Sequence, residues 1–362
     1  MQRGTKGAKM ERSPRRSELY NTNNSLGDVL GFGFMARRVH EAQRSNHQPA
    51  TGTTMLLYHS EIFEKHDTGT HPECIARIVN VNRMLEKQGW IERCTKPNWM
   101  AATLEQCKRN HTEKYLDQLH RWCEESAGRV ESDTVVSSGS WDAATLAAGA
   151  ACDAVRRVCR GEDTQAFCAV RPPGHHALRD APMGFCLLNS VSIAAQHARS
   201  LGCEKVLIVD WDVHHGNGTQ ASFWEDPTVG FVSIHRFPFY PGTGRVDETG
   251  TGDALGTTVN IPVSAQTGPK SFLDQLATQT EKFAKKFKPD LILLSAGFDA
   301  HENDPVGGLS LQSEHYFEAG KWIAALAKEH CQGRLVSLLE GGYHLEHLPE
   351  SLDAHLRGFI SD

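Results

Sequence analysis

Several features that mark particular classes of protein are missing from this chain of 362 residues. No apolar run approaches the roughly 20 residues that a membrane-spanning helix needs, so we expect no membrane partner. No internal repeat is visible. The ten cysteines include no Cys-x-x-Cys pair and no regular spacing, which argues against a structural zinc site or a disulfide framework. Free thiols are typical of a reducing compartment, and we predict a cytoplasmic location.

Positive charge is scarce over most of the chain. Residues 1–54 contain nine Lys/Arg and four Asp/Glu, a net charge of +5. Since the whole chain has a net charge of −6, the remaining residues carry −11. An acidic body argues against direct nucleic-acid binding. It suits a cationic substrate such as a lysine-rich peptide or a polyamine. The alternative is that an acidic surface serves only to keep the protein soluble.

The composition changes near residue 55. Residues 1–54 are rich in Gly, Ser, Asn, Thr and Arg and show no sustained periodicity, so we predict a disordered N-terminal extension. Ser13-Pro14-Arg15-Arg16 has the twin arginine of an export signal, but no apolar segment follows it, and we expect no export. Residues 55–362 are predicted to form one domain.

This domain has an α/β texture, because short apolar runs alternate with helical patterns. The predicted buried strands are 55–59, 166–170, 206–210, 229–235, 291–296 and 335–340. The predicted helices are 75–88, 140–160, 190–201, 271–287 and 313–329. The alternation indicates a central parallel sheet with helices on both faces. Ligands of such sheets bind outside the carboxyl ends of the strands.

Polar or glycine-rich clusters follow five of these strands, at that edge of the predicted sheet. The clusters are Arg171-Pro-Pro-Gly-His-His176, residues 210–217, His235 to Tyr240-Pro-Gly, Gly297-Phe-Asp299 and Gly341-Gly-Tyr343. Their convergence on one edge is stronger evidence for a site than any single motif.

The densest cluster reads Asp210-Trp-Asp212-Val-His214-His215-Gly-Asn217-Gly218. Charged groups at the end of a buried strand are costly unless they bind a metal or each other. Asp212 and His214 are two residues apart and are directed to one side of an extended backbone, and Asp299 is the best third ligand. Three such ligands leave an open position, as in hydrolytic metal sites. The alternatives are a hydrogen-bonded turn with coincidental histidines, and a helix cap at Asp299.

The remaining clusters offer proton-transfer groups. His175 and His176 are candidates for the base and the acid that a metal hydrolase needs, with Asp210 and Asn217 as their partners. Tyr343 follows two glycines and is a candidate hydrogen-bond donor to an oxyanion. The alternatives are a packed histidine and a surface tyrosine. The glycine-rich segment 242–252 lacks the Lys-Ser/Thr of a phosphate loop, and we expect a pocket-rim loop.

These residues resemble the histone deacetylase superfamily, which also includes acetylpolyamine amidohydrolases. The matching segments recur in the family's order over residues 55–362, and two of them look most like the class II branch. They are His71-Pro-Glu, Arg171-Pro-Pro-Gly-His-His-Ala177, Gly184-Phe-Cys186, Val209-Asp-Trp-Asp-Val-His-His-Gly-Asn-Gly218, Pro241-Gly-Thr-Gly244, Ala296-Gly-Phe-Asp-Ala300 and Leu339-Glu-Gly-Gly-Tyr343.

The resemblance implies a single-domain arginase/deacetylase-like fold and a zinc-dependent amidohydrolase, with Zn²⁺ or, in the cell, Fe²⁺. Asp212, His214 and Asp299 match its zinc ligands, and His176 matches its general base and acid. His175, paired with Asp210, matches the electrostatic partner. Tyr343 matches the phenol that polarises the acetyl carbonyl, and Asn217 the partner of His176. The implied substrate-binding residues are Asp133, Gly184, Phe185, Tyr240, Val306 and Gly342. Asp210 and Ser233 match a structural potassium site.

Two positions refine the expected substrate. Tyr343 is retained where a weakly active class II subgroup has His, so we expect true deacetylase activity. Val306 stands where polyamine-specific relatives carry an acidic residue, which favours an acetylated lysine peptide or protein over a small acetylated amine. The alternatives are an acetylpolyamine deacetylase and a non-catalytic acetyl-lysine reader. A dimanganese arginase would need more Asp and His ligands than the chain offers. The sequence does not determine the oligomeric state.

Overall fold

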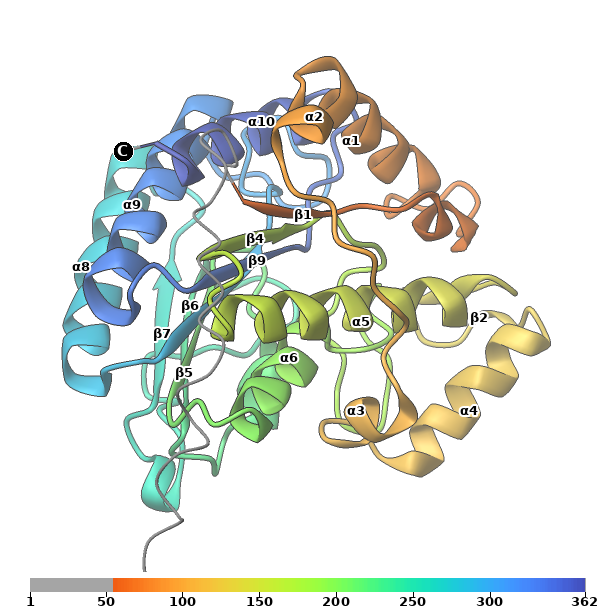
Figure 1. Ribbon diagram of the computed structural model, residues 1–362, viewed down its shortest axis with the longest axis horizontal. Helices are drawn as coiled ribbons and strands as arrows, with labels where there is room; N and C mark the ends of the chain where they lie inside the picture. Colours follow the sequence, from red (N-terminus) through yellow and green to blue (C-terminus); the bar gives the residue numbers. More distant parts are fainter. Residues whose placement is uncertain (1–54, 362) are drawn as a thin grey trace, which may run out of the picture. The chain divides into compact units, whose positions relative to one another are not determined.

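The computed structural model describes residues 55–361, which are built around one seven-stranded sheet (Figure 1). All six strand pairings are parallel. Across the sheet the strands are β1 (Leu56–Tyr58), β4 (Gln165–Cys168), β9 (Leu335–Leu339), β8 (Leu291–Ala296), β5 (Val206–Asp210), β6 (Val229–Arg236) and β7 (Thr258–Val263).

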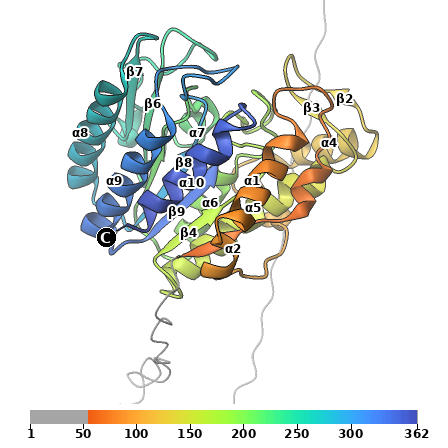
Figure 2. The same cartoon turned by 90° about the horizontal axis from the view of Figure 1, so that it is seen from above.

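Helices cover both faces of this sheet (Figures 1 and 2). On one face lie α5 (Ser140–Cys159) and α6 (Ser190–Ser200), which pack on each other. On the other face lie α8 (Pro269–Phe287), α9 (Ser313–Cys331) and α10 (His347–Phe359), with α1 (Ile75–Lys87) packed on α10. The strands are thereby shielded from water on both sides, which is why β5 and β8 are buried along their whole length.

Shorter elements connect these layers. They are η1 (Glu61–Lys65), α2 (Trp90–Arg93), α3 (Leu104–Lys108), α4 (Glu113–Glu124), β2 (Gly128–Arg129), β3 (Val135–Val136), α7 (Asn217–Ser222) and η2 (Gly252–Ala254). The strands β2 and β3 form a small antiparallel pair separate from the main sheet.

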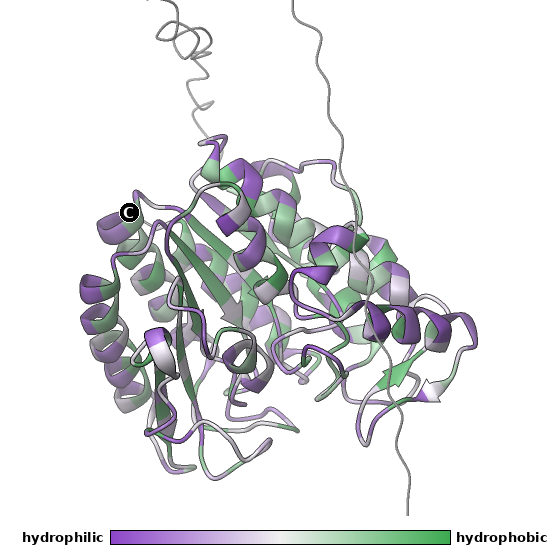
Figure 3. Ribbon diagram, turned by 90° about the horizontal axis from the view of Figure 1, so that it is seen from below, coloured by the Kyte–Doolittle hydropathy of each residue, from purple (hydrophilic) through white to green (hydrophobic). Residues whose placement is uncertain are grey.

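Hydropathy follows the layers (Figure 3): the strands are apolar and the outer surfaces of the helices are polar. Helix α5 is an exception, because it is buried on more than one side. Its alanines 143, 147, 150, 151 and 154 belong to the main core, whereas 144 and 148 belong to a second cluster that includes residues of α4. Small side chains let this helix approach both neighbours closely.

The connections reverse direction between two neighbouring strands, β5 and β8. From β5 the chain continues to β6 on one side, whereas from β8 it continues through α9 to β9 on the other. Such a switch point opens a crevice outside the carboxyl ends of the two strands. The segments that begin at Trp211 and Gly297 therefore enter the same crevice.

The predicted fold class is confirmed, and the predicted strands and helices correspond to β1, β4, β5, β6, β8 and β9 and to α1, α5, α6, α8 and α9. The sequence did not predict β7, α4 and α10, nor the short elements η1, η2, α2, α3, α7, β2 and β3. Strand β7 contains Pro262, which cannot donate a ladder hydrogen bond and is tolerated because β7 is an edge strand. No helix among residues 55–361 is long and apolar enough to cross a membrane. The extension predicted at 1–54 lies outside the described residues.

Candidate active site and metal centre

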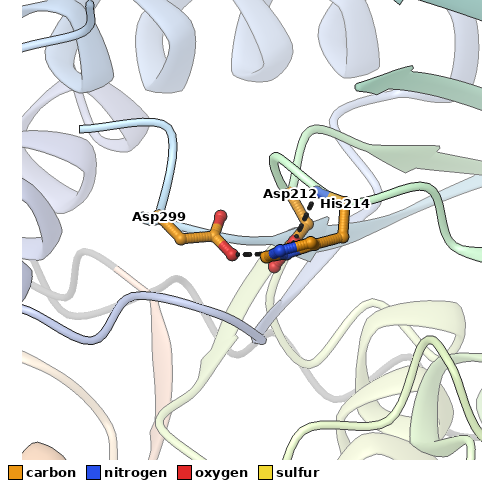
Figure 4. Close-up of side chains that lie close together, drawn as sticks. All are labelled: Asp212, His214 and Asp299. Carbon is orange, nitrogen blue, oxygen red and sulfur yellow. Dashed lines mark hydrogen bonds and ion pairs between the residues drawn. The ribbon is translucent and has the colours of Figure 1, made fainter. Parts of the chain in front are cut away.

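Asp212, His214 and Asp299 lie close together just beyond the carboxyl ends of β5 and β8 (Figure 4). Nδ1 of His214 lies 3.1 Å from Oδ1 of Asp212 and 3.0 Å from Oδ2 of Asp299. Two ligand atoms that are each about 2.0 Å from a tetrahedral zinc ion are roughly 3.3 Å apart. The spacing of the three side chains therefore fits a zinc-sized divalent cation.

Backbone N–H groups orient the two carboxylates. Asp212 accepts from His214 and from Gly341, both at 2.9 Å, and Asp299 accepts from Val213 at 2.9 Å. Gly341 also leaves room for them, because a Cβ there would overlap Oδ2 of Asp299. The two ligand-bearing loops and the loop after β9 thus form one tightly packed unit.

Two buried carboxylates side by side are costly without a compensating cation. Burial and the neighbouring charge of Asp212 raise the pKa of Asp299 to about 7. A bound divalent ion removes this repulsion and favours the ionised carboxylates. The set of two carboxylate oxygens and one imidazole nitrogen suits Zn²⁺ or Fe²⁺ rather than a soft thiolate-seeking metal. The residues present therefore fit the metal that the sequence predicts.

The two histidines lie next to this cluster, with ring centroids 4.1 Å apart. Nδ1 of His175 is 3.0 Å from Oδ2 of Asp210, and Nδ1 of His176 is 2.6 Å from the amide oxygen Oδ1 of Asn217. Each ring therefore donates its Nδ1 proton to its partner, which leaves Nε2 available for proton transfer.

The two imidazoles differ in protonation because different charged groups lie beside them in the same buried setting. Burial opposes a charge on His175, but the carboxylates of Asp210 and Asp212 outweigh it and raise the pKa of His175 well above its usual value. Burial and the neighbouring His175 and His214 lower the pKa of His176 well below its usual value, and neutral Asn217 offsets this only weakly. At neutral pH the pair therefore combines a charged ring, His175, with a neutral one, His176.

Aromatic rings surround the histidines. The ring of Tyr240 is 5.3 Å from that of His176, and Phe185 meets Tyr343 edge to face at 5.6 Å. Between them Gly184 has φ +55° and packs so closely on His176 that a Cβ would overlap the imidazole. A glycine is therefore needed at this position for two independent reasons.

Asp133 lies between β2 and β3 and contacts Gly184, next to these aromatic rings. Its Oδ1 accepts from the backbone N–H of Gly184 at 3.1 Å and from the hydroxyl of Thr134 at 2.9 Å. Burial raises the pKa of Asp133, and the phenol of Tyr240 is near enough to lower it in part. Asp133 is thus connected both to Gly184 and to Tyr240.

Tyr343 is 8% exposed and follows Gly342, whose φ of +121° favours glycine. Burial raises the pKa of the Tyr343 phenol well above 10, and the charges of Asp299 and Asp212 raise it further although Arg77 opposes them. The phenol is therefore a protonated hydrogen-bond donor throughout the physiological range.

Two predicted residues, Ser233 and Val306, contact groups outside the ligand cluster, and so does His215 of the same motif. Ser233 is the register partner of Asp210 on the adjacent strand, and its hydroxyl is 2.9 Å from Nδ1 of His235. Val306 is half-buried and is connected to the site through Asp304, which accepts its backbone N–H at 2.9 Å. His215 contacts Thr243 and Gln220 instead of the ligand cluster, at 2.7 and 3.1 Å. It anchors the glycine-rich segment 242–252.

Several supporting residues were not assigned from the sequence. Phe239 stacks on the ring of His214 at 5.2 Å, and the carboxylate of Glu340 accepts the N–H groups of Gly174 and His175 at 2.6 and 3.2 Å. Four other charged residues in or near the motifs, at positions 73, 77, 304 and 340, are buried in the structure. A charged residue within or beside an apolar motif is the sequence signal that could have identified such supporting residues.

Comparison with known proteins gives a consistent result. A model of the histone deacetylase domain family matches residues 71–359. A probable deacetylase of Archaeoglobus fulgidus is 39% identical over 295 residues, which are 81% of this chain and 82% of the relative. Histone deacetylase 14, chloroplastic, of Arabidopsis thaliana is 36% identical over 325 residues, 85% of this chain and 77% of that protein. The crystal structure of the HDA15 HD domain superposes with a TM-score of 0.81 at 34% identity, covering 85% of this chain and 88% of that one.

Proposed function

The chain belongs to the histone deacetylase family, and from this premise we propose that it removes acetyl groups from lysine side chains of proteins or peptides with the aid of a zinc ion. The family makes it a hydrolytic deacetylase that acts on amide bonds. The lysine side chain as substrate and zinc as the metal are our own proposals.

The observation that carries the proposal is the joint arrangement of three groups. The ligand cluster Asp212, His214 and Asp299, the His176–Asn217 pair and the buried phenol of Tyr343 all lie at the carboxyl edge of one sheet. Hydrolysis of an amide needs a polarised carbonyl, a base for water, an acid for the amine and a donor for the oxyanion. One residue or cluster is available for each of these tasks.

Asp212, His214 and Asp299 would hold the zinc ion, which when bound would supply a Lewis acid for the carbonyl and lower the pKa of water. His176 accepts a proton at Nε2 from the attacking water, since its lowered pKa keeps it neutral. It returns this proton to the departing lysine amine. Positively charged His175, held by Asp210, stabilises the negative charge that develops on the carbonyl oxygen of the substrate. The Tyr343 hydroxyl donates a hydrogen bond to this oxygen.

The surroundings of the site support an acetyl-lysine substrate. Phe185 and Tyr240 offer flat apolar surfaces that suit the methylenes of a lysine side chain, and Asp133 at the rim is an acceptor for substrate backbone amides. Val306 offers no negative charge to a second amine, which disfavours acetylpolyamines.

The test compares metal-dependent turnover of an acetyl-lysine peptide with turnover of acetylputrescine and acetylspermidine. We expect the peptide to be the best substrate and activity to disappear with a chelator and return with Zn²⁺. Turnover of the acetylpolyamines alone would replace the substrate class with small amines. An absence of turnover with all three, combined with tight binding of the peptide, would make the protein an acetyl-lysine reader.

The accessory components are proposed on separate grounds. We propose Zn²⁺ with Fe²⁺ as the cellular alternative, and a structural K⁺ held by Asp210 and Ser233, which are neighbours on β5 and β6. Metal analysis of protein purified without added metal tests the first, and activity after exchange of K⁺ for a large organic cation tests the second. We propose the cytoplasm as the location, because buried thiols such as Cys107, Cys152 and Cys168 fit a reducing compartment; imaging of a tagged chain tests this.

A further inference from the structure

The turn that carries Tyr343 contains two consecutive glycines, and its conformation depends on contacts from other segments. Arg77 donates from Nε to the carbonyl of Gly342 at 2.5 Å and from Nη2 to that of Glu340 at 2.6 Å. The N–H of Gly341 donates to Asp212 at 2.9 Å. The remaining polar backbone group that faces a charged side chain is the N–H of Tyr343 itself.

That N–H donates to Asp304, which also accepts the backbone N–H of Val306. Oδ2 of Asp304 lies 2.6 Å from the nitrogen of Tyr343, and Oδ1 accepts the N–H groups of Val306 and Gly307 at 2.9 and 3.0 Å. The side chain is 8% exposed. After burial, which opposes the charge on Arg77, and Glu73, which favours it most, Asp304 makes a smaller contribution to raising the pKa of Arg77. Each carboxylate oxygen thus has at least one backbone donor.

The loop around Asp304 is fastened to a metal ligand. Gly308 donates its N–H to the carbonyl of Asp299 at 2.9 Å, and a Cβ at Gly307 would overlap that same carbonyl. Asp304 therefore lies in a loop whose position relative to Asp299 is narrowly defined. Because Oδ2 of Asp304 accepts the backbone N–H of Tyr343, the position of this loop also determines where the Tyr343 backbone lies.

We propose that Asp304 is a positioning residue that holds the Tyr343 phenol at a defined distance from the metal ligands, and that it acts on catalysis only through Tyr343. The inference rests on the proposed function, in which Tyr343 donates to the oxyanion. A charge-assisted hydrogen bond at 2.6 Å is strong enough to restrain the flexible Gly341–Gly342 segment. A displacement of about 1 Å at a reacting group costs up to roughly 100-fold in rate.

Asp304→Asn is the sharpest single change, because it keeps the size of the side chain and one oxygen acceptor. If the amide oxygen stays with Val306 and Gly307, the NH₂ group faces the N–H of Tyr343 and the bond is replaced by a repulsion. A matched control is Asp163→Asn, because Oδ1 of Asp163 accepts the N–H groups of Thr164 and Gln165 at 2.7 and 3.3 Å before the start of β4, at the opposite edge of the sheet.

The experiment is a double-mutant cycle of Asp304→Asn and Tyr343→Phe, with kcat, KM, zinc content and thermal midpoint measured for each metal-loaded protein. We expect Asp304→Asn to lower kcat by about 10- to 100-fold with KM changed less than about threefold and with zinc retained. In the Tyr343→Phe background the same substitution should cost less than about twofold, whereas Asp163→Asn should leave kcat unchanged in both backgrounds.

Two outcomes of the cycle would overturn the inference: wild-type kcat in Asp304→Asn, or an equal loss in both backgrounds. A second measurement, ¹⁹F NMR of protein labelled with 3-fluorotyrosine, observes the ring directly. We expect the Tyr343 resonance, assigned with Tyr343→Phe, to shift and broaden in Asp304→Asn and to stay unchanged in the control. An unchanged resonance would refute the positioning role. Full turnover by Tyr343→Phe would instead refute the oxyanion role in the proposed function, while the resonance would still report on Asp304.

Discussion

Tyr343 presents the only side-chain hydroxyl that the proposed chemistry uses. Burial and neighbouring carboxylates keep it protonated, and its hydrogen bond is needed only when charge develops on the carbonyl oxygen. Tyr343→Phe is therefore expected to lower kcat by about 100- to 1000-fold while KM and the bound zinc change little. Steady-state kinetics and metal analysis of the purified variant measure both effects. A variant with wild-type kcat would remove Tyr343 from the mechanism.

Asn217 is the hydrogen-bond partner of the base His176, which must be neutral to accept a proton. The pKa of His176 lies well below its usual 6.5, so activity should persist below pH 6.5 and fall only as the pH approaches this lowered pKa. Asn217→Asp places a negative charge 2.6 Å from Nδ1 and should raise that pKa by roughly one to three units. The acid limb of the pH–kcat/KM profile should move to higher pH by that amount. A profile that coincides with wild type would contradict this assignment.

Three strands of the sheet shape the metal centre. Its ligands follow β5 and β8, and the segment after β9 packs against them. Gly341, after β9, lies against the carboxylates of Asp212 and Asp299. Gly341→Ala should displace both carboxylates and weaken zinc binding by about 10- to 100-fold, as loss of outer contacts does at other zinc sites. Competition with a chromophoric chelator measures the affinity. Gly268→Ala, where a Cβ meets open space, is the control and should bind zinc normally.

A buried ion cluster joins the segment before α1 to the loop after β4. The carboxylate of Glu73 forms ion pairs with Nε of Arg171 at 2.6 Å and with Nη1 of Arg77 at 2.8 Å, and all three side chains are buried. Glu73→Gln leaves two buried guanidinium groups without their counter-charge and should lower the free energy of unfolding at pH 7 by about 3 kcal/mol or more. Urea denaturation followed by circular dichroism measures the loss.

The same cluster has a defined pH dependence. Burial opposes the charge on Glu73, but Arg171, His66 and Arg77 outweigh it and hold the pKa of Glu73 far below its usual 4.5. Its contribution to stability is therefore complete above about pH 4.5 and is lost as the pH falls below that value. The difference between wild type and Glu73→Gln should narrow from pH 5 downwards. A constant difference would show that hydrogen bonding, rather than charge, stabilises the cluster.

On the scale of the whole molecule, charge outside residues 1–54 is strongly negative, at −11. This negative charge should attract lysine-rich acetylated peptides from a distance, and added salt should weaken the attraction. The KM for such a peptide is expected to rise several-fold between about 50 and 500 mM NaCl, whereas kcat should stay constant. A peptide with glutamates in place of the flanking lysines should show no such rise. Equal salt effects on both peptides would exclude long-range steering.

The linear chain was sufficient for those parts of the architecture that depend on local pattern. Continuous apolar runs such as 206–210 and 291–296 predicted buried parallel strands, and their alternation with helices predicted the layers. Edge strand β7 was missed because it contains Pro262, a residue that a strand tolerates where it has no neighbour on one side. Whether a strand lies at an edge is not a local property.

By itself the sequence determined that the chain has a parallel α/β core, because strand periodicity and residue type depend only on neighbouring residues. It also placed the following residues after strands: Asp212, His214, His175, His176, Asp299 and Tyr343. Only the tertiary structure decided that β5 and β8 are adjacent, which brings Asp299 within 3.0 Å of His214 across 85 residues of sequence. It also decided that Asp304 and Arg77 hold the Tyr343 turn. These contacts join segments far apart in the chain, and the physical reason is that burial and parallel pairing, not sequence distance, determine which charged groups meet.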